Sequence, residues 1–421
     1  MLTTRPRGTN DILPGQVEKW QYLEELARKI SEQYGFKEIR TPIFEHTELF
    51  LRGVGEATDI VEKEMYSFFD RGERNITLRP EGTAPTVRAF LENKLYANPQ
   101  PTKLFYIGPM FRYDRPQAGR YRQFNQFGIE VFGSHHPSVD AEVIALACDF
   151  FARLGLRDLE VHLNTVGCPD CRGKHKEELI AYFQKREHEL CETCQKRLHK
   201  NPLRILDCKS PVCQEISKNA PTTKDSACPE CQAHFADVKE YLDTIGIKYT
   251  EDPRLVRGLD YYTHTAFEIL VKGIGAQSAI CGGGRYNGLI EEVGGQPLPG
   301  IGFAIGMERI LLILEQQKLF SLQESNPDIY IAPLGNKTQA LAFELAIKLR
   351  KKGFKVEKDY LDRSLKAQLK SADRFQVKFV VIIGEEELSK GQVILRDMKT
   401  SAQTEISINN LEAYLEGRIE E

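Results

Sequence analysis

The segment "GPMFRYDRPQAGRYRQFNQFGIEVFG", residues 108–133, holds the side chains best suited to chemistry on a charged ligand. It concentrates four arginines, Arg112, Arg115, Arg120 and Arg122, in a chain whose formal net charge is only -3. A guanidinium group matches the geometry of phosphate and carboxylate oxygens and can donate two parallel hydrogen bonds to them. Since the chain as a whole has no excess of positive charge, this local concentration predicts a site for a phosphate-bearing ligand.

The second half of that segment predicts the floor of the site. Alternation in "RQFNQFGIEVF" predicts a strand with a core-facing side of Asn125, Phe127, Ile129 and Val131, and a second side of Phe124, Gln126, Gly128 and Glu130. Gln126 and Glu130 would stand roughly 13 Å apart, and the glycine between them is expected to leave open space. A solvated sheet face is the alternative, which the neighbouring arginines disfavour.

Two further segments add polar and aromatic side chains that could contact a ligand. "TLRPEGTAP" (77–85) offers Glu81 and Thr83, a carboxylate and a hydroxyl that suit an ammonium group. "LVRGLDYYTHTAFEI" (255–269) supplies Arg257 in a turn before a strand, followed by Tyr261 and Tyr262. Each segment alone is weak, and their combination is informative.

Two glycine-rich segments complete the set. "SAICGGGRYNGL" (278–289) has three consecutive glycines, which permit close approach of the backbone to a ligand. "GIGFAIGMERILLIL" (300–314) predicts a glycine-rich strand that enters a helix, with Arg309 in its first turn. The chain has neither the glycine-x4-glycine-lysine spacing of a Walker A loop nor a G-x-G-x-x-G that opens a helix after a strand. A nucleotide site would therefore be built from arginines on a sheet.

The elements that must position these residues form a mixed pattern. Apolar spacing predicts a helix over 16–36, and "KEIRTPIFE" (37–45) predicts a short strand broken at Pro42. Further strands are expected around 76–80, 103–113, 124–133, 261–271 and 278–281. Irregular spacing of these strands favours an antiparallel or mixed sheet over strict βαβ alternation. The fold class predicted is α+β.

Composition and the pattern of predicted helices and strands indicate two domains. We expect a first domain at 1–325, with an inserted helical module at about 165–240 that holds eight of the ten cysteines. After the polar linker "SLQESNP" (321–327), the segment 327–421 predicts a βαβαβ unit. No apolar run approaches the roughly 18 residues of a membrane helix, and the N-terminus lacks a signal-peptide core, so we expect a cytoplasmic protein without a membrane.

The cysteines have metal-ligand spacing. "CPDC" (168–171), "CETC" (191–194) and "CPEC" (228–231) are C-x-x-C pairs, and Cys208 and Cys213 form a looser fourth pair. Two such pairs complete a tetrahedral site, so the four pairs could hold one or two structural zinc ions. Reduced, packed thiols without metal are the alternative, and the spacing alone does not decide between them. The insertion is expected to lie away from the residues named above.

Taken together, these segments resemble the histidyl-tRNA synthetase family of class II aminoacyl-tRNA synthetases, essentially end to end. "RGTNDILP", "FRYDRPQAGRYRQFNQFGIEVFG" and "GIGFAIGMERI" are similar to the three class motifs, and "LVRGLDYY" and "GGGRYNGL" to two signatures of the histidine enzymes. The resemblance implies an antiparallel sheet flanked by helices, a helical insertion and a C-terminal α/β anticodon-binding domain. It also implies a homodimer that uses L-histidine, ATP with Mg²⁺, and the histidine tRNA.

The resemblance implies a role for each matching residue. The α-amino group of histidine would be held by Glu81, Thr83 and Gln126, and the imidazole ring by Glu130 and Tyr262, with Tyr261 in the pocket wall. ATP would be held by Arg112 at the α-phosphate beside histidine, by Arg309 at the γ-phosphate, by Arg120 and Arg122 near phosphate, and by Phe124 stacked on adenine. Arg257, the catalytic residue, would bridge the histidine carboxylate and the α-phosphate, and Arg115 and Gln117 would contact the tRNA acceptor end.

Two other functions compete with this interpretation. A regulatory, histidine-sensing subunit of ATP phosphoribosyltransferase is similar to the catalytic core of these synthetases and performs no chemistry. The C-terminal domain and the intact arginines at 112, 257 and 309 argue against it. A zinc-dependent nucleic-acid-binding protein would account for the cysteines and leave the rest of the chain unexplained.

Overall fold

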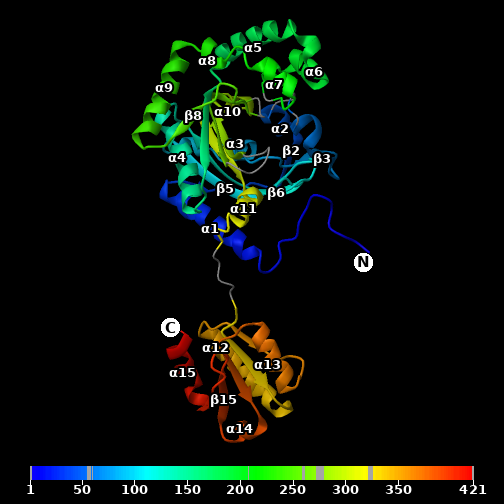
Figure 1. Ribbon diagram of the computed structural model, residues 1–421, viewed down its shortest axis with the longest axis vertical. Helices are drawn as coiled ribbons and strands as arrows, with labels where there is room; N and C mark the ends of the chain where they lie inside the picture. The colour runs from blue at the N-terminus through cyan, green and yellow to red at the C-terminus, as the bar shows by residue number, and fades with distance from the viewer. Residues whose placement is uncertain are drawn as a thin grey trace. The chain divides into compact units, whose positions relative to one another are not determined.

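The computed structural model describes residues 2–54, 58, 60–206, 208–257, 261–271, 279–320 and 326–419. The chain divides into two compact units, Met1–Ser321 and Leu322–Glu421 (Figure 1). Most of the expected linker 321–327, the centre of "LVRGLDYY" at 258–260 and the first residue of the strand expected at 278–281 lie outside the described residues. Within the described residues, no helix is long and apolar enough to cross a membrane.

The first unit is built on an eight-stranded sheet. Its strands, in spatial order, are β1 (Lys37–Glu38), β5 (Thr102–Phe111), β6 (Gln123–Phe132), β11 (Gly300–Gly306), β10 (Ala279–Arg285), β9 (Thr263–Val271), β7 (Leu159–Thr165) and β8 (Tyr249–Glu251). The edge pairs β1–β5 and β7–β8 are parallel, and every pairing between them is antiparallel. The antiparallel sheet expected from the sequence is therefore confirmed.

Helices cover one face of this sheet and form the main core with it (Figure 1). They are α1 (Val17–Gln33), α4 (Pro137–Arg153), α9 (Pro229–Thr244) and α11 (Met307–Gln316). In α1, the three- and four-residue spacing of Leu23, Ala27 and Ile30 buries all three side chains. The apolar side of β6, with Phe127, Ile129 and Val131, packs in the same core, as alternation predicted.

A smaller sheet and short helices stand beside the main sheet. The strands of the smaller sheet are antiparallel, in the order β2 (Phe44–His46), β4 (Asn75–Leu78) and β3 (Tyr66–Phe69). The short helices near it are α2 (Thr47–Val54), α3 (Thr83–Glu92) and α10 (Leu289–Glu292). The strand expected over 37–45 with a break at Pro42 forms as two short strands in different sheets, β1 in the large sheet and β2 in the small one. Pro42 lies in the segment between them and has no N–H to continue a ladder.

The insertion between β7 and β8 is helical. It consists of α5 (Pro169–Gln184), α6 (Glu192–Lys200), α7 (Pro211–Ser217), α8 (Thr223–Ser226) and α9, which gather at one end of the first unit (Figure 1). Its small core includes Leu179, Phe183, Leu198 and Ile205. The helices α6, α7 and α8 are too short to be stable alone, so they depend on this core and on whatever links them.

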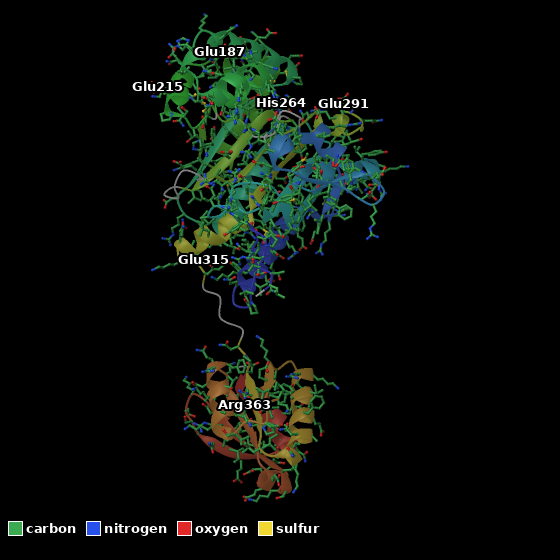
Figure 2. The ribbon with its side chains drawn as sticks, turned by 90° about the vertical axis from the view of Figure 1, so that its right-hand side faces the viewer. Glu187, Glu215, His264, Glu291, Glu315 and Arg363 are labelled. Carbon is green, nitrogen blue, oxygen red and sulfur yellow. The ribbon has the colours of Figure 1, made fainter. Side chains whose placement is uncertain are left out.

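The second unit contains the expected βαβαβ order. It runs β12 (Ile329–Pro333), α12 (Gln339–Lys351), β13 (Val356–Lys358), α13 (Leu365–Arg374), β14 (Phe379–Ile383), α14 (Glu385–Ser389), β15 (Gln392–Asp397), β16 (Gln403–Ser407) and α15 (Leu411–Ile419). The strands β13, β12 and β14 are parallel, and β15 and β16 extend the sheet antiparallel, which the sequence did not predict. Arg363, labelled in Figure 2, lies just before α13 and donates to the Tyr330 hydroxyl at 2.9 Å, which links that segment to β12.

Candidate active site

A cleft of about 310 Å³ opens over the polar face of β6, β10 and β11. Among the residues that line it are ten that the sequence assigned to a ligand: Glu81, Thr83, Arg112, Arg120, Phe124, Gln126, Arg257, Tyr261, Tyr262 and Arg309. They come from four segments that are far apart in the chain. Antiparallel pairing of β6 with β11 and of β10 with β9 brings these segments together.

Four arginines line this cleft, and three of them lie in the segments 108–133 and 300–314. Arg112 donates from Nε to the Pro80 carbonyl at 2.8 Å, and its Cζ lies 5.3 Å from the centroid of the Phe124 ring. Arg120 pairs with Asp114, and Arg309 donates to the Ala279 carbonyl. Burial, and secondarily the charge of Arg120, lowers the pKa of Arg309. Three guanidinium groups held in one partly desolvated cavity favour a polyanionic ligand.

Arg257 is held against strand β9. It forms an ion pair with Glu268, and its Cζ lies 5.7 Å from the Tyr262 ring centroid. Burial opposes its charge, but Glu268 together with Tyr262 and Cys281 outweighs burial, and the pKa of Arg257 is raised. A side chain at position 282 would occupy the same space, because a Cβ there would lie 2.1 Å from Nη2 of Arg257.

Of the three consecutive glycines in "GGGRYNGL", only Gly282 lines the cleft. Gly282, Gly283 and Gly284 belong to strand β10. A Cβ at Gly283 would lie 2.3 Å from the Gly302 carbonyl oxygen, and a Cβ at Gly284 2.4 Å from that of Thr265. These glycines make room for Arg257 and for the neighbouring strands. The expectation that they admit a ligand to the backbone is wrong for Gly283 and Gly284.

Glu81 is a buried acidic residue in the lining of the cleft. Its carboxylate accepts hydrogen bonds from the backbone N–H groups of Thr83 at 2.7 Å and Ala84 at 2.9 Å, at the start of α3. Burial raises its pKa, and these backbone hydrogen bonds oppose the rise. Gln126 stands nearby, 8% exposed, with an Oε1 atom that is buried and has no partner among the described residues. A buried acceptor of this kind predicts a ligand donor.

Alternation predicted that Glu130 would face open space, but its side chain does not line the cleft. The space above Gly128 is filled by Tyr106, whose Cζ would lie 2.3 Å from a Cβ at Gly128. Glu130 is 1% exposed and accepts hydrogen bonds from Thr83 Oγ1 at 2.7 Å, from Tyr106 and from Tyr286. Burial raises its pKa to about 8. The expectation of open space over Gly128 is therefore wrong, since a tyrosine from the adjacent strand occupies it.

Besides Glu130, three more predicted residues lie outside the lining of the cleft. The guanidinium of Arg122 stacks on Tyr113, with Cζ 3.8 Å from the ring centroid, and its Nε donates to the Asp114 carbonyl. Arg115 is exposed, and Gln117 lines a separate hollow with the N-terminal segment 5–10. The turn that carries Gln117 is closed by paired backbone hydrogen bonds with Arg120.

The cleft also contains residues that the sequence patterns did not single out. Tyr106, Glu268, Tyr286 and Glu308 line it. Tyr286 and Glu308 adjoin motif arginines in "GGGRYNG" and "GMERI", and that adjacency was the available signal. Arg285, which lies in the same motif, is structural: it is fully buried and pairs with buried Asp140 at 2.6 Å.

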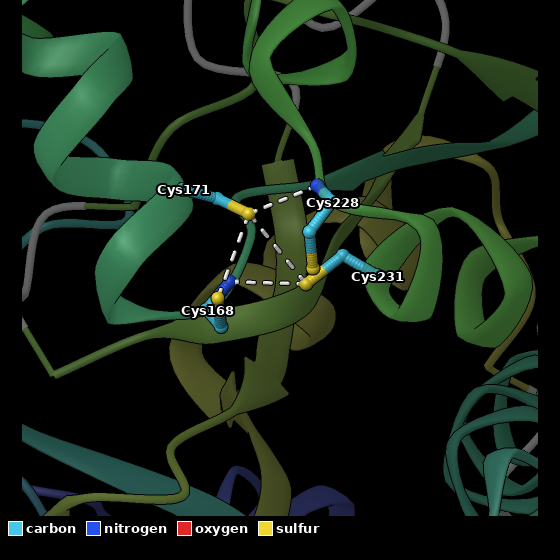
Figure 3. Close-up of side chains that lie close together, drawn as sticks. All are labelled: Cys168, Cys171, Cys228 and Cys231. Carbon is cyan, nitrogen blue, oxygen red and sulfur yellow. Dashed lines mark hydrogen bonds between the residues drawn. The ribbon is translucent and has the colours of Figure 1, made fainter.

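The insertion holds two clusters of four cysteines. One consists of Cys168, Cys171, Cys228 and Cys231 (Figure 3), and the other of Cys191, Cys194, Cys208 and Cys213. In each cluster the four sulfur atoms lie within 4.8 Å of one another. The first C-x-x-C pair is thus joined to the last, and the middle pair to the looser one.

Known proteins resemble the whole chain. The family model "Histidyl-tRNA synthetase" matches residues 8–310, and "Anticodon binding domain" matches residues 328–418. A histidine–tRNA ligase of Desulforamulus reducens is 62% identical over 99% of this chain and 100% of its own length. The structure of apo S. aureus histidyl-tRNA synthetase matches with a TM-score of 0.82 at 44% identity, over 98% of this chain and 99% of its own.

A Bacillus halodurans C structure, an ATP phosphoribosyltransferase regulatory subunit/histidyl-tRNA synthetase, matches with a TM-score of 0.64 over 91% of this chain and 99% of its own. Its identity to this chain is 23%, so it shows a shared fold alone. The full-length relatives at 54–62% identity are histidine–tRNA ligases. They favour a catalytic function over the histidine-sensing alternative.

Proposed function

Because the chain belongs to the histidyl-tRNA synthetase family, we propose that its cleft activates L-histidine with ATP and that it then esterifies the 3′ end of the histidine tRNA. One observation carries the proposal: Arg112, Arg120 and Arg309 share a single cavity with Glu81 and Gln126. A polyphosphate and an ammonium group therefore have separate, complementary partners within reach of one another.

Histidine binds at the Glu81 end. Glu81, Thr83 and the partnerless Oε1 of Gln126 accept the protons of its α-amino group. Tyr261 and Tyr262 form the wall around the imidazole ring. Glu130 acts on the ring through Tyr286, whose O–H it accepts. The Tyr286 oxygen thereby keeps its lone pairs for an imidazole N–H.

ATP binds along the arginines. Arg112 takes the α-phosphate beside histidine, Arg120 and Arg309 take the outer phosphates, and Phe124 stacks on adenine. Arg122 contributes through Tyr113 and the Asp114 backbone, by supporting the segment that carries Arg120. This division rests on the resemblance to the family, and the presence of all three guanidinium groups in the cleft lining supports it.

Arg257 is the catalytic residue for the first step. A carboxylate oxygen of histidine attacks the α-phosphorus, the bond to the bridging β-oxygen breaks, and pyrophosphate leaves with the electron pair. Charge builds on the α-phosphate oxygens in the transition state, and a fixed guanidinium nearby stabilises it. In the second step a tRNA 3′-terminal hydroxyl attacks the adenylate carbonyl, and AMP leaves.

The cleft also fits Mg²⁺ bound together with the nucleotide. Mg²⁺ takes oxygen ligands from phosphates and from one or two carboxylates. Glu268 and Glu308 are cleft carboxylates that would hold it beside the phosphate-binding arginines. When bound, the ion would supply neutralisation of phosphate charge.

The tRNA contacts both units. Arg115 and Gln117, exposed on the turn beside the cleft, bind the acceptor end, and the Leu322–Glu421 unit binds the anticodon. An exposed arginine on a turn can reach a phosphate without first breaking a buried contact.

The chain acts as a homodimer. In and next to the small sheet, Ile43, Phe44, Phe68 and Phe69 expose 45–72% of their surface, and large apolar side chains exposed in one region support an interface. Light scattering should give twice the 48.0 kDa chain mass, and Phe69→Arg should shift it to the monomer. We place the enzyme in the cytoplasm, where free thiols persist.

Histidine-dependent exchange of pyrophosphate into ATP tests the assignment. Wild type should exchange only with histidine, and Arg257→Ala should lose exchange by about 10² to 10³ while its thermal unfolding is unchanged. Absence of exchange in folded wild-type protein, with histidine binding retained, would instead support a histidine sensor.

A further inference from the structure

The two cysteine clusters have the geometry of single-ion sites. Within the first, Sγ of Cys171 lies 3.5 Å from that of Cys168 and 4.0 Å from that of Cys231. Within the second, Sγ of Cys191 lies 3.8 Å from that of Cys208. Four thiolates around one zinc ion at 2.3 Å stand about 3.8 Å apart, as the edges of a tetrahedron. The observed spacing matches that edge.

Backbone N–H groups surround the sulfur atoms. Cys168 N–H donates to Cys231 Sγ at 3.3 Å, and Cys228 N–H to Cys171 Sγ at 3.1 Å (Figure 3). In the second cluster Cys191 N–H donates to Cys213 Sγ at 3.3 Å and Ser210 N–H to Cys208 Sγ at 3.4 Å. Each cluster thus has two backbone N–H groups that donate to its sulfur atoms, and such donors stabilise the negative charge of metal-bound thiolates.

Helix starts add to this stabilisation. Cys168 and Cys228 immediately precede α5 and α9, and Cys171 and Cys231 lie in their first turns. The positive ends of two helices therefore point toward the first cluster, which favours thiolates over neutral thiols. Cys148 and Cys281, the two remaining cysteines, lie outside both clusters.

We propose that each cluster binds one zinc ion, giving two structural tetrathiolate sites per chain, and that the first site also positions a wall of the histidine pocket. The first site joins the entry of the insertion, after β7, to its exit at α9. The second joins α6 and α7, which are too short to persist unaided. Binding energy at such sites acts directly as folding energy.

The link to the pocket runs through residues beside the first site. Arg172 follows Cys171, and its Nη1 donates to the Tyr262 carbonyl at 2.8 Å. Gly167, which precedes Cys168, accepts from the His264 N–H at 2.9 Å. The insertion is therefore not remote from the cleft, contrary to the expectation from sequence. Loss of the first ion should displace Tyr262 and weaken histidine specifically.

Elemental analysis of full-length protein purified without chelator tests the metal. Two zinc ions per chain are expected, with one lost in Cys228→Ser and the other in Cys208→Ser. Cys148→Ser is the matched control and should keep both. Cobalt supplied in place of zinc should give the visible spectrum of tetrahedral thiolate coordination. Metal-free folded protein, or iron in place of zinc, would overturn the proposal.

A second measurement uses wild-type protein, so it does not depend on whether the cysteine variants fold. When wild-type thiols are titrated with an organomercurial, two zinc ions per chain should be released as the eight cluster thiols react. Limited proteolysis should then cut between residues 169 and 228. Release of no zinc while all ten thiols react freely in folded protein would contradict both sites.

The positioning role has its own test. Arg172→Ala should raise KM for histidine about tenfold in pyrophosphate exchange, with KM for ATP unchanged, and Arg172→Lys should restore part of the loss. Lys174→Ala, an exposed change in the same helix, is the control. Equal effects on both substrates, or none, would refute the positioning role and leave the metal count to be judged by the elemental analysis.

Discussion

Replacing Gly282 by alanine should displace the Arg257 guanidinium and slow catalysis, although Arg257 itself is not mutated. A Cβ at this position would lie 2.1 Å from Nη2 and 2.5 Å from Cζ of Arg257. Ordinary contact begins at about 3.5 Å, so the guanidinium must move by at least about 1 Å. Its ion pair with Glu268 limits where it can go.

The size of the effect follows from that displacement. A shift of about 1 Å in a catalytic group costs about 10²-fold in rate, and complete loss of one such electrostatic contact costs about 10² to 10³. We therefore expect Gly282→Ala to slow pyrophosphate exchange by about 10²-fold. Folding should be retained, because the end of a flexible side chain is what must move.

A double-mutant cycle isolates the cause. In the Arg257→Ala background the added methyl group meets no guanidinium, so Gly282→Ala should have almost no further effect on exchange. Gly288→Ala is the matched control within the same motif, because the nearest atom to its new Cβ would lie 3.9 Å away. It should behave as wild type.

Two results would refute this reasoning. Additive losses in the double variant would mean that position 282 acts independently of Arg257. Exchange by Gly282→Ala within a few-fold of wild type would mean that the position of the guanidinium does not matter. Thermal unfolding of all four proteins guards against loss of structure as the explanation.

Other predictions follow from buried charge. Burial raises the pKa of Glu130 to about 8 from an ordinary 4.5, so the folded state retains a proton that the unfolded chain releases, and this group's contribution to stability falls as pH rises between those values. Glu130→Gln should remove that dependence, so the melting temperature of the variant minus that of wild type should rise from pH 5 to pH 8. The KM of the variant for histidine should rise more than its KM for ATP. A melting-temperature difference that does not change with pH would mean that another group holds the proton. Arg285→Met leaves the buried carboxylate of Asp140 with only the His234 ring as a side-chain partner and should cost about 3–5 kcal/mol of unfolding free energy, with partial recovery on adding Asp140→Asn. A loss below about 1 kcal/mol would contradict the pairing. Arg309→Met should raise KM for ATP with little change for histidine, and equal changes for both would remove it from the phosphate site.

Much of the fold could be predicted from local patterns. The spacing of Leu23, Ala27 and Ile30 predicted α1, and the alternation of Phe127, Ile129 and Val131 predicted the core side of β6. These succeed because a helix and a strand each present side chains with a fixed period, whatever they pack against. The resemblance of the motifs to a known family then joined segments that no local pattern connects.

The sequence by itself determined which residue types are available to the site: the arginines at 112, 120, 257 and 309, the acid Glu81 and the eight clustered cysteines. Only the tertiary structure decided what surrounds them. In the folded chain Tyr106 occupies the space over Gly128, and Arg257 occupies the space next to Gly282. Arg122 stacks on Tyr113, and the first cysteine pair lies beside the last. The physical reason is that strand register and close packing between distant segments choose each neighbour, and a local pattern contains no information about either.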